Sequence, residues 1–132
     1  MLQKLNTKRG GFTLVEIMIV VAIIALLAAI AVPGFLRARK RSQASKVLND
    51  LRLIDAAVDQ YAIENNKATG NAVPIAAWTQ YLKANTSLYN TGSHPTYGTY
   101  GGQTVDTIPK VPANAYADLS DVAPSSFWAP YY

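Results

Sequence analysis

The chain contains no cysteine and only one histidine among its 132 residues. The lack of cysteine excludes a disulfide-stapled scaffold, a thiolate zinc site and a cysteine nucleophile. A single histidine leaves little scope for a histidine-rich metal centre or a histidine-based catalytic triad. That residue, His94, lies in the turn-forming segment Gly-Ser-His-Pro, where we expect a solvated loop side chain rather than a general base. The sequence therefore indicates a protein that is not an enzyme.

Charged side chains are also scarce, at 15% of the chain, and they are unevenly distributed. Residues 1–52 carry nine basic and two acidic side chains, whereas residues 53–132 carry three basic and six acidic ones. The overall charge of +4 is therefore not that of a uniformly basic domain. The densest cluster, at residues 37–41, has no interleaved aromatic side chains, so we do not expect nucleic acid as a partner.

One segment has no charged or hydroxyl side chain at all. Residues 17–36 read IMIVVAIIALLAAIAVPGFL, and a helix of these 20 residues is about 30 Å long, enough to cross a lipid bilayer. The rest of the chain is too short to enclose a helix that is apolar on every side. The segment is therefore predicted to be transmembrane.

Three kinds of membrane segment fit this run. The first is a secretory signal peptide cut after Ala31, which would release a small exported binding protein. The second is a signal anchor that keeps its helix, and the third is a segment whose cleavage site precedes the run. Glu16 helps to separate them, because an unpaired carboxylate at the start of a membrane helix costs a few kcal/mol and neither of the first two needs one.

The residues around Glu16 carry a more specific pattern. Residues 8–16 read KRGGFTLVE and resemble the processing site of type IV prepilins and type II secretion pseudopilins. The resemblance implies cleavage after Gly11 by a prepilin peptidase, followed by N-methylation of Phe12. It also implies that the Glu16 carboxylate pairs with the terminal amine of Phe12 on a neighbouring subunit, which would give the buried charge a partner.

The same resemblance implies a function. The protein would be a structural subunit of a type IV pilus-like or type II secretion pseudopilus filament, a homopolymer built from an inner-membrane precursor by a membrane assembly platform. Its N-terminus would lie in the cytoplasm, and the subunit would end in a periplasmic pseudopilus or an extracellular pilus. The charges flanking the apolar run do not themselves settle this orientation. A minor pilin acting as an adhesin or DNA receptor stays an alternative, and the lack of cysteine favours a pseudopilus modestly.

Helical periodicity continues beyond the apolar run. Val47, Leu51, Ile54 and Val58 recur at steps of four, three and four, which predicts an amphipathic helix. We therefore expect one helix over residues 13–64, kinked or locally melted at Pro33.

The C-terminal region is predicted to be small and mixed. Residues 74–82 indicate a short helix, whose Trp78 and Leu82 we expect to pack on the Val58 and Tyr61 face of the long helix. Two β-prone runs around Gly101-Gly102 predict a hairpin. Prolines favour an irregular tail, whose last six residues we expect to cover the small sheet. The fold class is thus α+β: a long, partly transmembrane helix and a small C-terminal region. Its four segments are a leader at 1–11, a hydrophobic half-helix at 12–36, an amphipathic half-helix at 37–66 and a globular region at 67–132.

No cofactor is expected, and calcium is the alternative. Major pseudopilins, which the N-terminal motif resembles, hold calcium in a C-terminal loop. In this chain Asp118 and Asp121 are spaced so that both offer oxygen ligands, although such acidic residues are also common in turns and helix caps.

Overall fold

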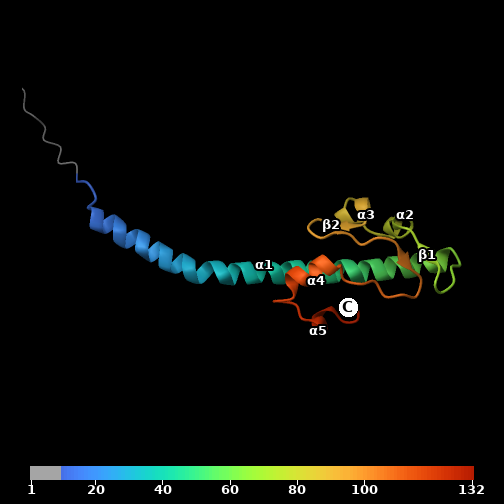
Figure 1. Ribbon diagram of the computed structural model, residues 1–132. Coiled ribbons are helices and arrows are strands. Elements are labelled where there is room, and N and C mark those ends of the chain that lie inside the picture. The colour runs from blue at the N-terminus through green and yellow to red at the C-terminus, as the bar shows by residue number, and fades with distance from the viewer. Residues whose placement is uncertain (1–9) are drawn as a thin grey trace, which may run out of the picture. The chain divides into compact units, whose positions relative to one another are not determined.

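A single helix dominates the computed structural model, which describes residues 10–132 (Figure 1). This helix, α1, spans Leu14–Glu64 and is 51 residues long, which confirms the predicted helix to within one residue. The described residues divide between Leu36 and Arg37 into two compact units.

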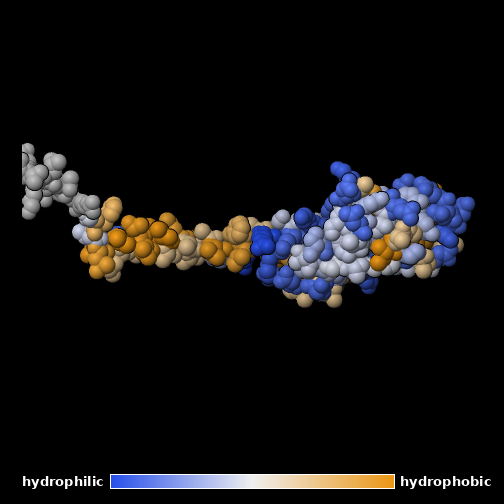
Figure 2. All heavy atoms as spheres, turned by 90° about the horizontal axis from the view of Figure 1, so that it is seen from above, coloured by the Kyte–Doolittle hydropathy of each residue, from blue (hydrophilic) through white to orange (hydrophobic). Residues whose placement is uncertain are grey.

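The first unit holds the apolar half of α1. Every residue of this half is exposed, and its large side chains include Ile17, Leu26 and Phe35 at 53%, 63% and 68% exposure. Figure 2 shows the hydrophobic surface running along this part of the helix. By length and composition α1 is able to cross a membrane, the one such helix in the described part of the chain. The helix is unbroken at Pro33, so the predicted local melting is wrong, while the kink there stays a prediction.

The second unit begins with the amphipathic half of α1. Its buried side chains recur every three or four residues and so form one stripe, as predicted: Ala44, Val47, Leu51, Ile54, Ala57, Val58 and Ala62. The remaining chain folds along this stripe. It comprises β1 (Ala72–Val73), α2 (Ile75–Trp78), a 3-10 turn (Thr79–Tyr81), α3 (Ser87–Thr91), β2 (Ser93–His94), β3 (Gly98–Thr99), β4 (Gln103–Thr104), α4 (Ala113–Leu119) and α5 (Ser125–Trp128).

Two hydrophobic clusters hold these elements on α1. The cluster nearer the end of α1 includes Val58, Trp78 and Leu88, with Tyr61 and Leu82 packed against it. This confirms the short helix predicted over residues 74–82, which forms as α2 and the 3-10 turn, and its packing. The other cluster joins Ala44, Val47 and Leu51 to residues of α4 and α5, including Leu119 and Trp128.

The strands pair differently from the prediction. The hairpin expected around Gly101-Gly102 does not form, because β3 pairs with β2 and β4 pairs with β1, both antiparallel. Residues 95–97 form the turn between β2 and β3, and His94 faces Gly98 across it. β4 lies beside β1, where Val73 and Val105 enter the core together. Gly101-Gly102 therefore links two separate two-stranded sheets.

The C-terminal tail is also more regular than predicted. Its prolines do not prevent helices, because Pro112 and Pro124 stand immediately before α4 and α5, where proline is tolerated. Its aromatic residues Trp128 and Tyr131 pack with the buried face of α1 rather than covering a sheet. This packing buries the first part of the stripe, at Ala44, Val47 and Leu51.

Candidate assembly site

The predicted processing site lies open to solvent. Gly11 and Phe12 precede α1 without regular structure, and Phe12 is 86% exposed. Apart from its two chain neighbours, no heavy atom of the described residues lies within 4 Å of the position that a Cβ would take on Gly11. The bond between these residues is therefore sterically accessible to a peptidase.

Thr13 and Glu16 form a reciprocal pair of hydrogen bonds at the start of α1. The backbone N–H of Thr13 donates to Glu16 Oε2 at 2.8 Å, and the N–H of Glu16 donates to Thr13 Oγ1 at 3.2 Å. This is a capping box, which satisfies two backbone donors that the first turn leaves free. Sequence reasoning missed it, although the spacing Thr-x-x-Glu is its usual signal. The carboxylate is thereby held one residue from the nitrogen of Phe12.

The apolar half of α1 offers a long surface for packing. Small residues alternate with large ones along it, at Ala22, Ala25, Ala28 and Ala29. Small side chains allow helices to approach closely in a membrane or a bundle. The structure places Pro33 within this surface and leaves it exposed.

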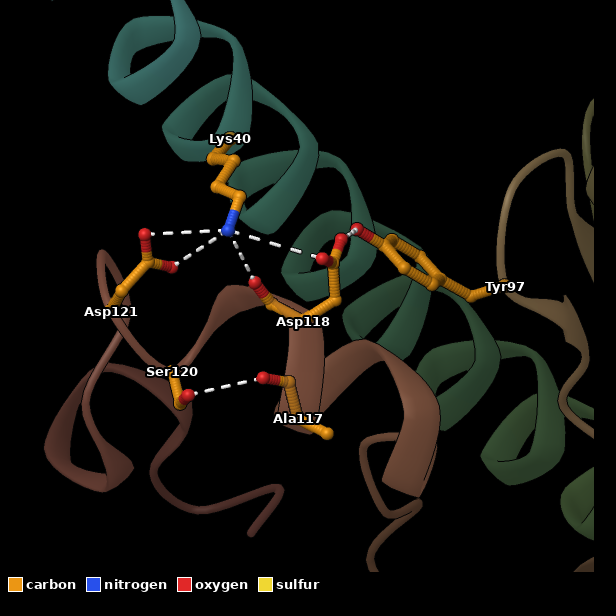
Figure 3. Close-up of polar contacts among 6 residues, drawn as sticks. All are labelled: Lys40, Tyr97, Ala117, Asp118, Ser120 and Asp121. Atoms are coloured by element: carbon orange, nitrogen blue, oxygen red, sulfur yellow. Dashed lines mark hydrogen bonds and ion pairs between the residues drawn. The ribbon is translucent and has the colours of Figure 1, made fainter. Parts of the chain in front are cut away.

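Lys40 fastens the C-terminal tail to the amphipathic half of α1 (Figure 3). Its Nζ donates to the carbonyl oxygen of Asp118 at 2.9 Å and to the Asp121 carboxylate at 3.2 Å. The Asp118 carboxylate lies 3.9 Å away and accepts a hydrogen bond from the Tyr97 hydroxyl at 2.8 Å. Burial and this bond raise the pKa of Tyr97 to about 12. A cation is favourable here because Asp118 lies in the last turn of α4, where the helix dipole places partial negative charge.

The two predicted calcium ligands, Asp118 and Asp121, thus both contact the ammonium group of Lys40. Within residues 10–132, no group of three or more acidic or histidine side chains comes together that could hold a metal ion. Calcium binding by Asp118 and Asp121 stays a prediction.

His94 is buried, which corrects the expectation of a solvated loop residue. It is 4% exposed, stacks on Tyr97, and accepts a hydrogen bond at Nδ1 from the Thr96 N–H at 3.1 Å. Burial lowers the pKa of His94, while the nearby Asp50 charge opposes that shift. Burial also raises the pKa of Asp50, although a hydrogen bond from the Tyr100 hydroxyl at 3.0 Å works against it.

These residues adjoin a groove of about 490 Å³ between α1 and the segment that follows α2. Its apolar side chains include Leu53, Leu82 and Leu88, and Lys46 and Lys83 stand among its polar ones. The groove was not predicted, because its two walls lie about 30 residues apart in the sequence and no local pattern joins them.

Comparison with known proteins points to the N-terminal segment. Residues 6–32 match the family model of the prokaryotic N-terminal methylation motif. The chain is 46% identical over 65 residues to the type IV wide pilus major component PilA4 of Thermus thermophilus, covering 49% of this chain and 50% of that protein. It is 45% identical over 64 residues to the type IV major fimbrial protein FimA of Dichelobacter nodosus, and the match covers 48% of this chain and 40% of that protein.

A secretion protein is similar over the same part. The chain is 35% identical over 60 residues to the type II secretion system core protein G of Klebsiella pneumoniae, covering 46% of this chain and 43% of that protein. The chain thus spans half or less of the length of these three relatives. No solved structure is significantly similar to it. The chain therefore carries a prokaryotic N-terminal methylation motif, and about half of it is similar to type IV pilins and type II secretion system core proteins.

Proposed function

We propose that this protein is a structural subunit of a type IV pilus-like or type II secretion pseudopilus filament. The observation that carries the proposal is the apolar half of α1, which is exposed throughout and lies largely within the methylation motif at residues 6–32. A surface of this length is not stable in water, because its apolar side chains have no cover in their own subunit. A lipid bilayer covers it before assembly, and the same helices of other subunits cover it in the filament.

Processing prepares the subunit for this exchange. A prepilin peptidase cuts the accessible bond after Gly11, and the new N-terminus at Phe12 is methylated. The leader, with its basic residues, keeps the N-terminus on the cytoplasmic side of the inner membrane. A membrane assembly platform then moves the helix from lipid into the bundle.

Glu16 has two roles in this proposal. Within one subunit it caps α1 through the Thr13 amide. In the filament its carboxylate pairs with the Phe12 amine of a neighbour, since a carboxylate in an apolar bundle is costly without a positive partner. The capping box supports this second role, because it already holds the carboxylate beside the N-terminus.

The N-terminus of the mature protein tests the proposal. We expect mass spectrometry of the protein from its own organism to give residues 12–132 with one added methyl group, and electron microscopy to show filaments that contain it. A mature chain starting at Val32 would instead support an exported protein released by a signal peptidase. A chain that keeps residues 1–11 would support a permanent membrane anchor.

A further inference from the structure

The groove beside α1 has the properties of a docking surface for protein. We call it the Leu53 groove and define it by Lys46, Leu53, Leu82 and Lys83. Leu53 is 45% exposed although it lies in the folded second unit. Neither lysine forms an ion pair with any residue that the structure describes. The one acid that lines the groove, Asp50, already accepts the Tyr100 hydroxyl.

A complementary surface lies on another side of the same helix. We call it the Ile63 ridge and define it by Asp59, Ile63 and Asp106. Ile63 is 78% exposed, more than any other large apolar side chain between residues 37 and 132. Asp59 and Asp106 are exposed and pair with no cation among residues 10–132, while Lys67 is the one cation beside them.

The two surfaces do not overlap. At 100° a residue, Leu53 and Ile63 are turned about 80° from each other around α1, and Lys46 and Asp59 about 140°. A contact between different surfaces of identical chains is heterologous, and it repeats without closing when each copy is shifted along one axis. A second copy parallel to the first, moved along α1, is able to bring its ridge to the groove.

We propose that the Leu53 groove receives the Ile63 ridge of a second copy of this chain. Ile63 would enter beside Leu53 and Leu82, which buries apolar surface that the single subunit leaves exposed. Asp59 and Asp106 would approach Lys46 and Lys83, giving opposite charges at the rim and fixing the register of the contact. This inference rests on the proposed filament function and names the surfaces by which the globular regions join.

Cysteine crosslinking tests the contact, because the natural chain has no cysteine. The double variant Leu53→Cys with Ile63→Cys, oxidised in intact filaments, is expected to give a ladder of dimers, trimers and longer species. Each single variant is expected to stay monomeric. The matched control is Leu53→Cys with Ile108→Cys, since Ile108 is 47% exposed outside both surfaces, and it is expected to give no ladder.

The outcomes separate this contact from the filament function. Filaments of normal appearance without a ladder would overturn the contact and leave the filament proposal intact, as would dimers from either single variant. A natural chain that makes no filaments would overturn the function itself. As a second measurement, Lys46→Glu should reduce filament yield several-fold, and adding Asp59→Lys should restore it. Failure of the pair to restore yield, with both variants folded by circular dichroism, would overturn the contact.

Discussion

The Glu16 carboxylate accepts the backbone N–H of Thr13 at 2.8 Å, and Thr13 Oγ1 accepts the N–H of Glu16 at 3.2 Å. Glu16 therefore carries two properties that substitution can separate: a side-chain oxygen at the third helical position, and a negative charge beside the mature N-terminus. The first stabilises the start of α1 in one subunit. The second matters only when another subunit brings an amine.

Glu16→Gln is expected to remove the charge and keep the cap, because glutamine also fits the third position of a capping box. We expect normal cleavage after Gly11 and a strong loss of filaments, measured by mass spectrometry of the N-terminus and by filament yield. Glu16→Ala and Glu16→Val should behave alike in assembly. Normal filaments from Glu16→Gln would contradict pairing with Phe12.

Thr13→Ala is the matched control, since it removes the cap and keeps the charge. Loss of a threonine cap costs about 0.5–2 kcal/mol in helix stability. We expect fraying of the first turn, seen as faster amide hydrogen exchange near residue 14, with filaments still formed. Loss of filaments as severe as in Glu16→Gln would show that the cap, rather than the charge, governs assembly.

Lys40→Met should loosen the C-terminal tail. The ammonium bonds to Asp118 and Asp121 are partly exposed, with about a third of the Lys40 side chain accessible, so water weakens them. We expect a loss of about 1 kcal/mol in the free energy of unfolding. Urea unfolding of the mature protein in detergent, followed by tryptophan fluorescence, measures it. Arg39→Met is the control, because Arg39 is exposed and forms no ion pair with residues 10–132, and it should leave the midpoint unchanged.

The sequence predicted the elements whose pattern is local. The stripe from Val47 to Val58 repeats at helical spacing, so the amphipathic half of α1 was predictable, and Pro74 marked the start of α2. The capping box was equally local, with Thr13 three residues before Glu16, but Glu16 was interpreted through its charge and not through its capping oxygen.

The errors concern contacts between distant residues. Lys40 forms an ion pair with Asp121, which lies 81 residues later in the sequence, and no local pattern predicts such a pair. The Gly101-Gly102 step suggested a hairpin because the runs on both sides are β-prone, yet each run pairs with an earlier strand. Tertiary packing of Val73 with Val105 outweighed the local turn preference.

Acid is expected to destabilise the second unit through His94. The pKa of His94 is lowered from 6.5 in the folded protein, so the unfolded chain binds a proton at a higher pH than the folded chain does. The free energy of unfolding therefore decreases as the pH falls below 6.5. The charge of Asp50 raises the pKa of His94, and the charge of Lys46 lowers it. The pKa of Asp50 itself is raised in the folded protein, so protonation of Asp50 at lower pH favours the folded state.

His94→Asn tests this dependence, because an asparagine oxygen is able to accept the Thr96 N–H that Nδ1 now accepts. We expect the variant to show a flatter dependence of unfolding free energy on pH just below 6.5, measured by urea unfolding at closely spaced pH values. An unchanged slope would mean that another group takes up the proton on unfolding.

Gly92 should be the least replaceable glycine of the second unit. It follows α3 with φ +61°, and a Cβ there would lie 2.5 Å from Ile75 Cγ2 and 3.3 Å from Trp78 Cζ2. Gly92→Ala therefore combines left-handed backbone strain of about 1–2 kcal/mol with a clash worth about 1–3 kcal/mol. Gly98→Ala isolates the strain, because Gly98 has φ +79° and open space around it. We expect urea unfolding to show a loss for both variants and a clearly larger one for Gly92→Ala. Equal losses would mean that Ile75 moves aside freely, so that the packing around Trp78 is less rigid than its burial implies.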